Sequence, residues 1–279
     1  MIEGAIEQAI ANIRSKSCCE EGNHAHAVTI NFHPDRYTSN KTPLLQAIAS
    51  DGKLKSQFET STSNGGLTAY TGGARWIWEQ SVFDGAYDNA ADHLRPKYGA
   101  LNFREYPTGA AARFGSSYFE LKPHVLERTT FCYPDSFFEP TDFAIASRLK
   151  ALIDKASSDN VDRLDDYIEA HVHGEISLKE DVECIVLDPA YRETGIERYA
   201  RHLDIPIKWH NGFKLSVEAM ARYPEYRGKE YIELAEELSQ DGVIDPRILG
   251  LAVTEKGYDE QDVKKVWHYL ARFGYQSLD

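Results

Sequence analysis

The sequence lacks the features that mark several classes of protein. No apolar run approaches the roughly 18 residues that a membrane-spanning helix needs. Residues 1–13 contain two glutamates and lack the basic start and long apolar stretch of a signal peptide. The chain also has no GxGxxG loop and no regular βαβ alternation. We therefore expect no membrane segment, no secretion signal and no dinucleotide-binding sheet.

Cysteine and positive charge are also scarce. Four cysteines in 279 residues do not make a disulfide scaffold. Cys18 and Cys19, followed by His24 and His26, lack the usual gap between zinc ligands, so we expect reduced thiols and no metal. The net charge of −13 argues against a nucleic-acid partner, because phosphates attract clustered cations. A partner protein with a basic face would suit this charge.

The apolar periodicity indicates a mixed α+β chain. Helical spacing predicts helices over residues 2–13, 43–48, 76–87 and 143–156. Strands are expected over residues 27–32, 98–103 and 116–121, with a strand pair within 166–187. From about residue 228 the strand signals end and helix signals continue. We predict a catalytic domain over residues 1–227 and a small helical appendage over residues 228–279.

The most informative stretch runs from Tyr167 to Gly174 and alternates polar with apolar residues. A period of two is typical of a half-buried strand. Tyr167, Glu169, His171 and His173 then share one face. Because an unpaired charge is costly to bury, we expect this polar face to line a cleft.

Three elements along the chain suggest one kind of chemistry. Arg36 follows a strand and a proline, and an arginine fork suits a pyrophosphate. The hydroxyl run from Thr60 to Ser63 can hold a carboxylate by hydrogen bonding, although it also precedes a glycine turn. Glu169 can stabilise positive charge that develops at the anomeric carbon of a ribose. Together they point to a phosphate-bearing substrate that passes through an oxocarbenium-like state.

This order resembles the R-S-E class of ADP-ribosyltransferases, which uses Arg, Ser-Thr-Ser and Glu on successive strands. The resemblance becomes more specific in four blocks of sequence. They are VTINFHPDR (28–36), SQFETSTSNGG (56–66), FGSSYFELKPHVLERTTF (114–131) and YIEAHVHG (167–174) with DVECIVLDP (181–189). These blocks look like the CteC-like type III effectors, a bacterial family long catalogued as of unknown function that transfers ADP-ribose to a threonine of ubiquitin.

The resemblance implies an ADP-ribosyltransferase-type split β-sandwich with a helical N-terminus and a helical C-terminal appendage. It implies NAD as the donor substrate, no metal, and ubiquitin as the protein partner, whose modification would block host ubiquitination. It implies a bacterial virulence effector that occupies the bacterial cytoplasm before secretion and the host cytosol after delivery. We expect a monomer, with no nucleic-acid or membrane partner.

The resemblance also assigns residues. The catalytic set would be Glu169, Arg36, Ser61 and Ser63. The NAD contacts would be Arg36, Phe58, Thr62, Asn64 and His171, with Phe58 stacking on nicotinamide. Arginine-modifying members of the class carry Glu or Gln two residues before the catalytic glutamate. Here Tyr167 stands at that position, which favours a hydroxyl acceptor.

Several alternatives stay open at this point. The strand serines Ser116 and Ser117 compete with Ser61 and Ser63 for the role of supporting the glutamate. Glu218 is a rival catalytic carboxylate, although its place at a helix start suits the helix dipole. A metal-dependent hydrolase would use His171 and His173 with a carboxylate. A non-catalytic module would keep the fold and bind a partner through the helical tail.

Overall fold

A large mixed sheet is the centre of the computed structural model, which describes residues 2–18, 21–22, 25–61 and 67–276. Within these residues the sheet has eight strands in the order β10-β9-β4-β1-β3-β7-β5-β6, and only β9 and β10 run parallel. Its strands are β1 (Val28–Phe32), β3 (Lys97–Leu101), β4 (Ser117–Leu121), β5 (Thr129–Tyr133), β6 (Asp142–Ile145), β7 (Ile168–Val172), β9 (Val182–Leu187) and β10 (Ile207–Trp209). Two short ribbons pair β2 (Lys53–Leu54) with β8 (Ile176–Ser177), and β11 (Leu215–Ser216) with β12 (Val243–Ile244).

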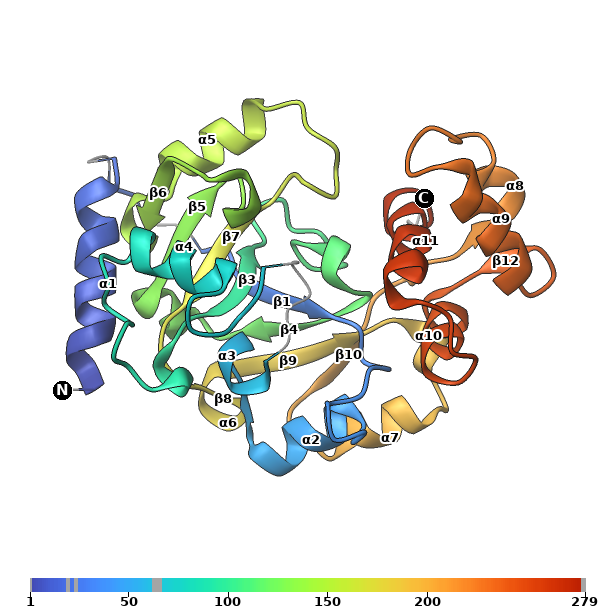
Figure 1. Ribbon diagram of the computed structural model, residues 1–279, viewed down its shortest axis with the longest axis horizontal. Coiled ribbons are helices and arrows are strands. Elements are labelled where there is room, and N and C mark those ends of the chain that lie inside the picture. Colours follow the sequence, from blue (N-terminus) through green and yellow to red (C-terminus); the bar gives the residue numbers. More distant parts are fainter. Residues whose placement is uncertain (1, 19–20, 23–24, 62–66, 277–279) are drawn as a thin grey trace.

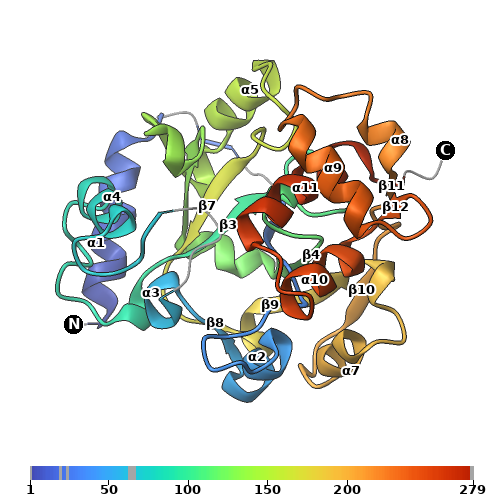
Figure 2. The same ribbon diagram turned by 45° about the vertical axis from the view of Figure 1, so that its right-hand side comes forward.

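Helices surround this sheet. Figure 1 shows α1 at one end of the sheet and the C-terminal helices gathered at the other, and Figure 2 gives the same arrangement from a second side. The α-helices are α1 (Ile2–Lys16), α2 (Leu44–Asp51), α3 (Gln57–Thr60), α4 (Ala74–Val82), α5 (Lys150–Ser158), α6 (Leu178–Asp181), α7 (Gly195–Arg201), α8 (Val217–Met220), α9 (Lys229–Leu238), α10 (Pro246–Thr254) and α11 (Glu260–Phe273). The expected mixture of helices with a large sheet is confirmed. None of the helices described is both long and apolar enough to cross a bilayer.

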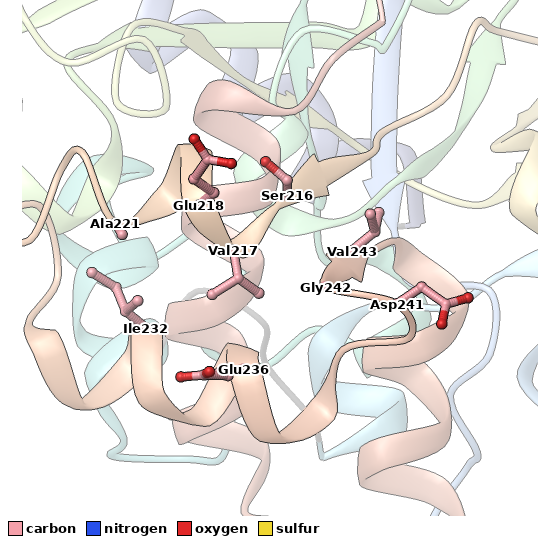
Figure 3. Close-up of a pocket in the computed structure, with 9 residues that line it drawn as sticks. All are labelled: Ser216, Val217, Glu218, Ala221, Ile232, Glu236, Asp241, Gly242 and Val243. Carbon is pink, nitrogen blue, oxygen red and sulfur yellow. The ribbon is translucent and has the colours of Figure 1, made fainter.

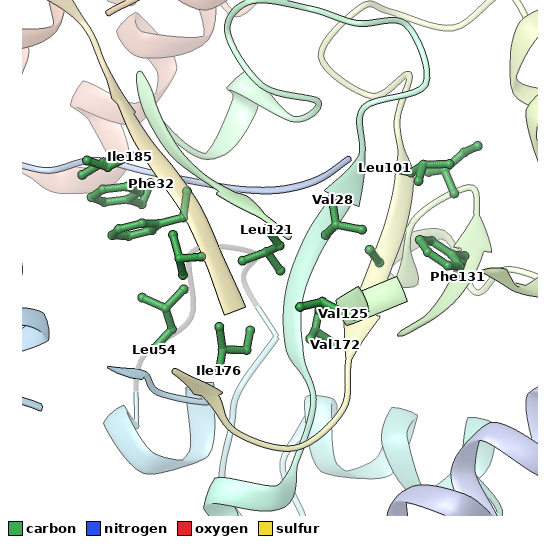
Figure 4. Packing of buried hydrophobic residues seen from close by; sticks show 14 of the residues in the cluster. Val28, Phe32, Leu54, Leu101, Leu121, Val125, Phe131, Val172, Ile176 and Ile185 are labelled. Atoms are coloured by element: carbon green, nitrogen blue, oxygen red, sulfur yellow. The ribbon is translucent and has the colours of Figure 1, made fainter. Parts of the chain in front are cut away.

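Strand β7 lies inside the sheet, between β3 and β5. Its apolar face, formed by Ile168, Ala170 and Val172, is fully buried in the main hydrophobic core. Figure 4 shows Val172 in this core together with Leu101 and Phe131 of the two neighbouring strands. The period-two pattern therefore gave the correct strand and the correct division of its two faces.

The C-terminal part has a hydrophobic core of its own. Trp267, Tyr269 and Leu270 of α11 pack there with residues of α9 and α10. This core also includes Leu164 and Phe213, which precede residue 228 where the sequence pattern changes. The predicted helices of the tail are confirmed, while the short strand β12 within it was not predicted.

Two details of the secondary-structure prediction were wrong. Residues 143–156 do not form one helix, because Asp142–Ile145 is the strand β6 and the helix α5 begins at Lys150. Phe143 and Ile145 favour a strand, and they pack against the N-terminal helix in a separate cluster. The strands within 166–187 are also not a pair, because β3, β1 and β4 lie between β7 and β9.

Candidate functional site

The polar face of β7 is buried and does not line an open cleft. His171 and His173 are fully buried, and Glu169 is 6% exposed. Helix α4 and the segment after it cover this face, with Trp78 against the ring of His171 and Tyr87 stacked on His173. Polar groups tolerate such burial when they satisfy one another, and the side chains of this face do so.

A chain of hydrogen bonds connects Tyr87 to Glu169. Tyr87 Oη lies 2.6 Å from His173 Nδ1, and Thr130 Oγ1 lies 2.9 Å from His173 Nε2. The same Thr130 oxygen lies 3.1 Å from His171 Nδ1, and His171 Nε2 lies 3.0 Å from Glu169 Oε1. Thr130 reaches the histidines because it stands directly opposite His171 in the β5–β7 ladder. We call these five side chains the relay.

The direction of donation in the relay follows from the carboxylate. An ionised Glu169 only accepts, so His171 donates through Nε2 and accepts the Thr130 hydroxyl at Nδ1. Thr130 has one proton, so its oxygen must accept from His173 Nε2, and His173 Nδ1 accepts from Tyr87. Burial lowers the pKa of both imidazoles, which keeps them neutral as this order requires. Every donor of the relay therefore points toward Glu169.

The second carboxylate oxygen of Glu169 is held from another direction. Ser136 donates its hydroxyl to Glu169 Oε2 at 3.0 Å, and Arg75 Nη1 donates to the Ser136 oxygen at 2.8 Å. Burial alone would raise the pKa of Glu169. The hydrogen bond from His171, the charge of Arg75 and the hydrogen bond from Ser136 outweigh burial, so the pKa lies below its usual value. Glu169 is thus a buried carboxylate that stays ionised.

A second carboxylate lies beside the first. Asp135 precedes Ser136, and its Oδ2 accepts the hydroxyl of Tyr167, which shares the polar face of β7 with Glu169. Burial and the charge of Glu169 raise the pKa of Asp135. Phe137 and Phe138, which come directly after Ser136, are 63% and 49% exposed and contact each other edge to face.

Three atoms that could bind a metal ion lie close together beside Glu169. Cys132, Glu169 and His171 each offer one, and all three lie within 4.8 Å of one another. Cys132 is the cross-strand neighbour of Glu169, which explains the proximity. However, burial raises the pKa of the Cys132 thiol well above its usual value, and both nitrogens of His171 are used in the relay. These groups therefore suit a hydrogen-bonded network better than a metal centre.

Arg36 lies near the C-terminal helices, and its interactions there are an ion pair with Glu260 at 2.8 Å and one with Asp35 at 3.6 Å. Other cations gather around it. Burial and the charges of Arg36 and Lys264 lower the pKa of the half-buried His33. Burial, with Arg113 and three further cations, lowers the pKa of His268 to about 2. We call Arg36, Arg113 and Lys264 the basic cluster.

The basic cluster extends toward Glu169 through Arg113. Arg113 forms an ion pair with Asp165, four residues before Glu169. Its charge also acts on Asp135 and Tyr167, and in the other direction on Lys264 and His268. Arg113 thus acts on groups at two places, Asp135 and Tyr167 beside Glu169, and Lys264 and His268 beside His33.

The other predicted side chains occupy different places. Phe58 is buried, with the guanidinium of Arg95 4.1 Å from its ring centre. Ser61 is exposed and ends α3 in a left-handed conformation. Thr62, Ser63 and Asn64 lie outside the described residues. Ser117 is on β4, three strands from β7 and so about 14 Å away at the usual strand spacing, and Ser116 directly precedes it. The serine that bonds Glu169 is Ser136.

Glu218 lies in α8, in the C-terminal part that has a hydrophobic core of its own. We call this part the C-terminal unit. It stands at the start of α8 as predicted, with its side chain 88% exposed and 3.6 Å from Arg222. Figure 3 shows it on the rim of a pocket of about 500 Å³. Glu236 and Asp241 share this rim, with Val217, Ile232 and Val243 between them. This carboxylate is open to water and is not held by buried hydrogen bonds as Glu169 is.

Four residues around Glu169 were not predicted from the sequence: Ser136, Asp135, Arg75 and Thr130. A signal existed for the first two, because Pro-Asp-Ser after the aromatic run that ends at Tyr133 is a turn signature following a strand. Arg75 and Thr130 carry no local signal. Their roles come from contacts that the sheet and α4 create between distant segments.

Comparison with known proteins gives one family and two curated relatives. The family model described as "Protein of unknown function (DUF3626)" matches residues 27–154 and 142–273. The chain is similar to the "Gene 2 protein" of Mycobacterium phage L5, at 27% identity over 171 residues. It is similar to the "Gene 2 protein" of Mycobacterium phage D29, at 27% identity over 170 residues. Each alignment covers 53% of this chain and 62% of the phage protein.

Proposed function

The chain belongs to the family described as "Protein of unknown function (DUF3626)", and we propose that it is a mono-ADP-ribosyltransferase that moves ADP-ribose from NAD to a protein acceptor. An ADP-ribosyltransferase-type architecture and a place among the CteC-like effectors are parts of this proposal and rest on the sequence blocks given above. So do ubiquitin as the first acceptor to test, delivery into a host cell, and action as a monomer.

The state of Glu169 carries the proposal. Breaking the bond between C1′ of the ribose and nicotinamide leaves positive charge on the sugar. A carboxylate that is already ionised and fixed stabilises that charge without reorganising during the reaction. Glu169 has the relay on one oxygen and Ser136 on the other, so both its charge and its rotamer are set in advance. Ser136 would take the supporting role that the resemblance gives to Ser61 or Ser63.

The charge pattern around the site supports NAD as the donor. The charges of Arg36, Arg113 and Lys264 act on His33 or His268, although carboxylates pair with both arginines. Guanidinium groups suit a pyrophosphate, and the carboxylate end suits the ribose cation. In this proposal Arg36 keeps its predicted role in phosphate binding, and Arg113 connects that end of the site with Glu169.

The exposed Phe137 and Phe138 support a protein as the acceptor. They lie on the turn whose Ser136 bonds Glu169, and exposed aromatic side chains of this kind commonly contact protein partners. Replacing both with serine is expected to raise the KM for the protein acceptor by about tenfold or more. NAD cleavage in water should stay within about twofold of wild type, because neither side chain belongs to the relay. A Tyr223→Ser variant, exposed on the C-terminal unit, is the matched control. Equal KM values for all three proteins would refute the docking role.

The metal-dependent hydrolase remains the second candidate, because Cys132, Glu169 and His171 lie together, although the predicted ligand His173 is not among them. The relay occupies both nitrogens of His171, so we expect exhaustive chelation to leave activity and thermal stability unchanged. Dialysis against a strong chelator, followed by an activity assay with and without added Zn²⁺, measures this. Loss of activity that Zn²⁺ restores would favour the hydrolase over the proposal.

Labelled NAD tests the proposal as a whole. The protein is incubated with adenine-labelled NAD and a eukaryotic lysate, and label is followed on proteins and in the soluble fraction. Label on a protein, with nicotinamide released in equal amount, is the expected result. Label only in free ADP-ribose would indicate an NAD hydrolase. The absence of NAD cleavage would favour the non-catalytic binding module.

A further inference from the structure

Two carboxylates are held together at the proposed site by reciprocal hydrogen bonds. Ser136, next to Asp135 in the chain, donates to Glu169 at 3.0 Å. Tyr167, two residues before Glu169 on the same face of β7, donates to Asp135. The turn after β5 and the strand β7 are therefore joined twice, once through each carboxylate.

The two carboxylates differ in electrostatic environment. Glu169 has the charge of Arg75 and two hydrogen-bond donors, which favour its ionised form. Asp135 is buried beside the charge of Glu169, and both effects favour its protonated form, against the bonds from Tyr167 and the Phe137 amide. Paired carboxylates whose environments differ in this way commonly divide the roles of charge stabilisation and proton transfer.

We propose that Asp135 is the general base that takes the proton from the attacking hydroxyl of the acceptor, an inference that rests on the proposed function. The bond between C1′ and the nicotinamide nitrogen breaks, and its electron pair leaves with nicotinamide. An oxygen lone pair of the acceptor hydroxyl forms the new bond to C1′. The hydroxyl proton passes to Asp135 and then to water.

The geometry leaves Asp135 able to accept this proton. Its Oδ1 accepts the Phe137 amide and caps the short 3₁₀ turn Ser136–Phe138, while its Oδ2 accepts the Tyr167 hydroxyl. A carboxylate oxygen can accept two hydrogen bonds, so capacity remains at Oδ2. Asp135 itself is 5% exposed, and Phe137, two residues further along the same turn, is 63% exposed.

This assignment gives Tyr167 a function. An alcohol is a poor nucleophile until it loses its proton, so a hydroxyl acceptor needs a base. Tyr167 donates its hydroxyl to Asp135 and so holds that carboxylate in position. In this assignment the base is Asp135, in the turn after β5.

An Asp135→Asn variant, with azide as an alternative acceptor, tests the proposal. Asparagine caps a turn as well as aspartate does, so the fold should persist, and thermal unfolding checks this. Transfer to the protein acceptor should fall by about 10²–10⁴-fold, the usual contribution of a general base. Azide has no proton to lose, so it should restore nicotinamide release in Asp135→Asn and not in Glu169→Gln. Asp142→Asn, a partly exposed carboxylate near the same turn, is the control with normal transfer.

The outcomes separate the proposal from the function on which it rests. Wild-type protein that releases no nicotinamide from NAD would overturn both. With an active wild type, normal transfer by Asp135→Asn would overturn the role of base alone. Loss of transfer without rescue by azide would also overturn it, since the carboxylate would then only hold the site together.

Discussion

Replacing Glu169 with glutamine is expected to lower the rate of NAD cleavage by about 10²–10³-fold, or more if no other group stabilises the ribose cation. The variant keeps the size of the side chain and one accepting oxygen, and it removes the negative charge. The KM for NAD should change little, because the charge acts mainly on the transition state. Nicotinamide release at saturating NAD, measured beside circular dichroism of both proteins, gives the result.

Glu218→Gln is the matched control for this experiment. Glu218 is also a glutamate that the sequence offered as catalytic, yet its side chain is 88% exposed at a distant pocket. We expect its substitution to leave NAD cleavage within about twofold of wild type, as for most exposed sites. A large loss in Glu218→Gln together with a small loss in Glu169→Gln would move the active site to the C-terminal unit.

Replacing Arg75 with methionine is expected to destabilise the fold by about 3–5 kcal/mol, the usual effect of removing one partner of a buried charged group. Arg75 is 3% exposed, donates to Ser136 and lies 3.9 Å over the ring of Tyr98. Its loss leaves Glu169 and Glu79 buried with less compensating charge. Urea denaturation at neutral pH measures the change. Arg201→Met removes an exposed arginine of an ion pair along α7 and should cost less than about 1 kcal/mol.

The Arg75→Met substitution is also expected to change how stability and activity depend on pH. The pKa of Glu169 is lowered in the folded protein, so its contribution to stability is full above the ordinary glutamate pKa and is lost as the pH falls through the lowered value. Without Arg75 the pKa of Glu169 rises. The destabilisation by Arg75→Met should therefore be largest near neutral pH and shrink in acid, and the acidic fall in activity should begin at higher pH. A destabilisation that is the same at every pH would show that Arg75 acts by packing alone.

The strand that carries Glu169 could be predicted because its signal is local. Alternation from Tyr167 to His173 fixes both the strand and the side chains that share a face, whatever the rest of the chain does. Burial of that face could not be predicted from the same pattern. It depends on Tyr87, which bonds His173 from 86 residues earlier in the chain, and on Trp78 of α4, which packs against the ring of His171.

The partners of Glu169 show the same limit. Ser136 and Thr130 contact the site because β5 pairs with β7, and the chain between them gives no indication of that pairing. The hydroxyl that supports Glu169 was predicted within Thr60–Ser63, because the order of elements in the sequence resembles that of the R-S-E ADP-ribosyltransferases. Only the arrangement of strands identifies Ser136 as the side chain that bonds the carboxylate.

Intact-mass spectrometry of ubiquitin, after incubation with NAD and the wild-type protein, is the most direct test of the proposed reaction. We expect a gain of one ADP-ribose unit, carried on a hydroxyl side chain and absent when Glu169→Gln replaces the wild type. Unmodified ubiquitin, with no nicotinamide released, would contradict the proposed reaction if the labelled-NAD experiment also shows no labelled lysate protein. The same gain with Glu169→Gln would contradict the role assigned to the buried carboxylate.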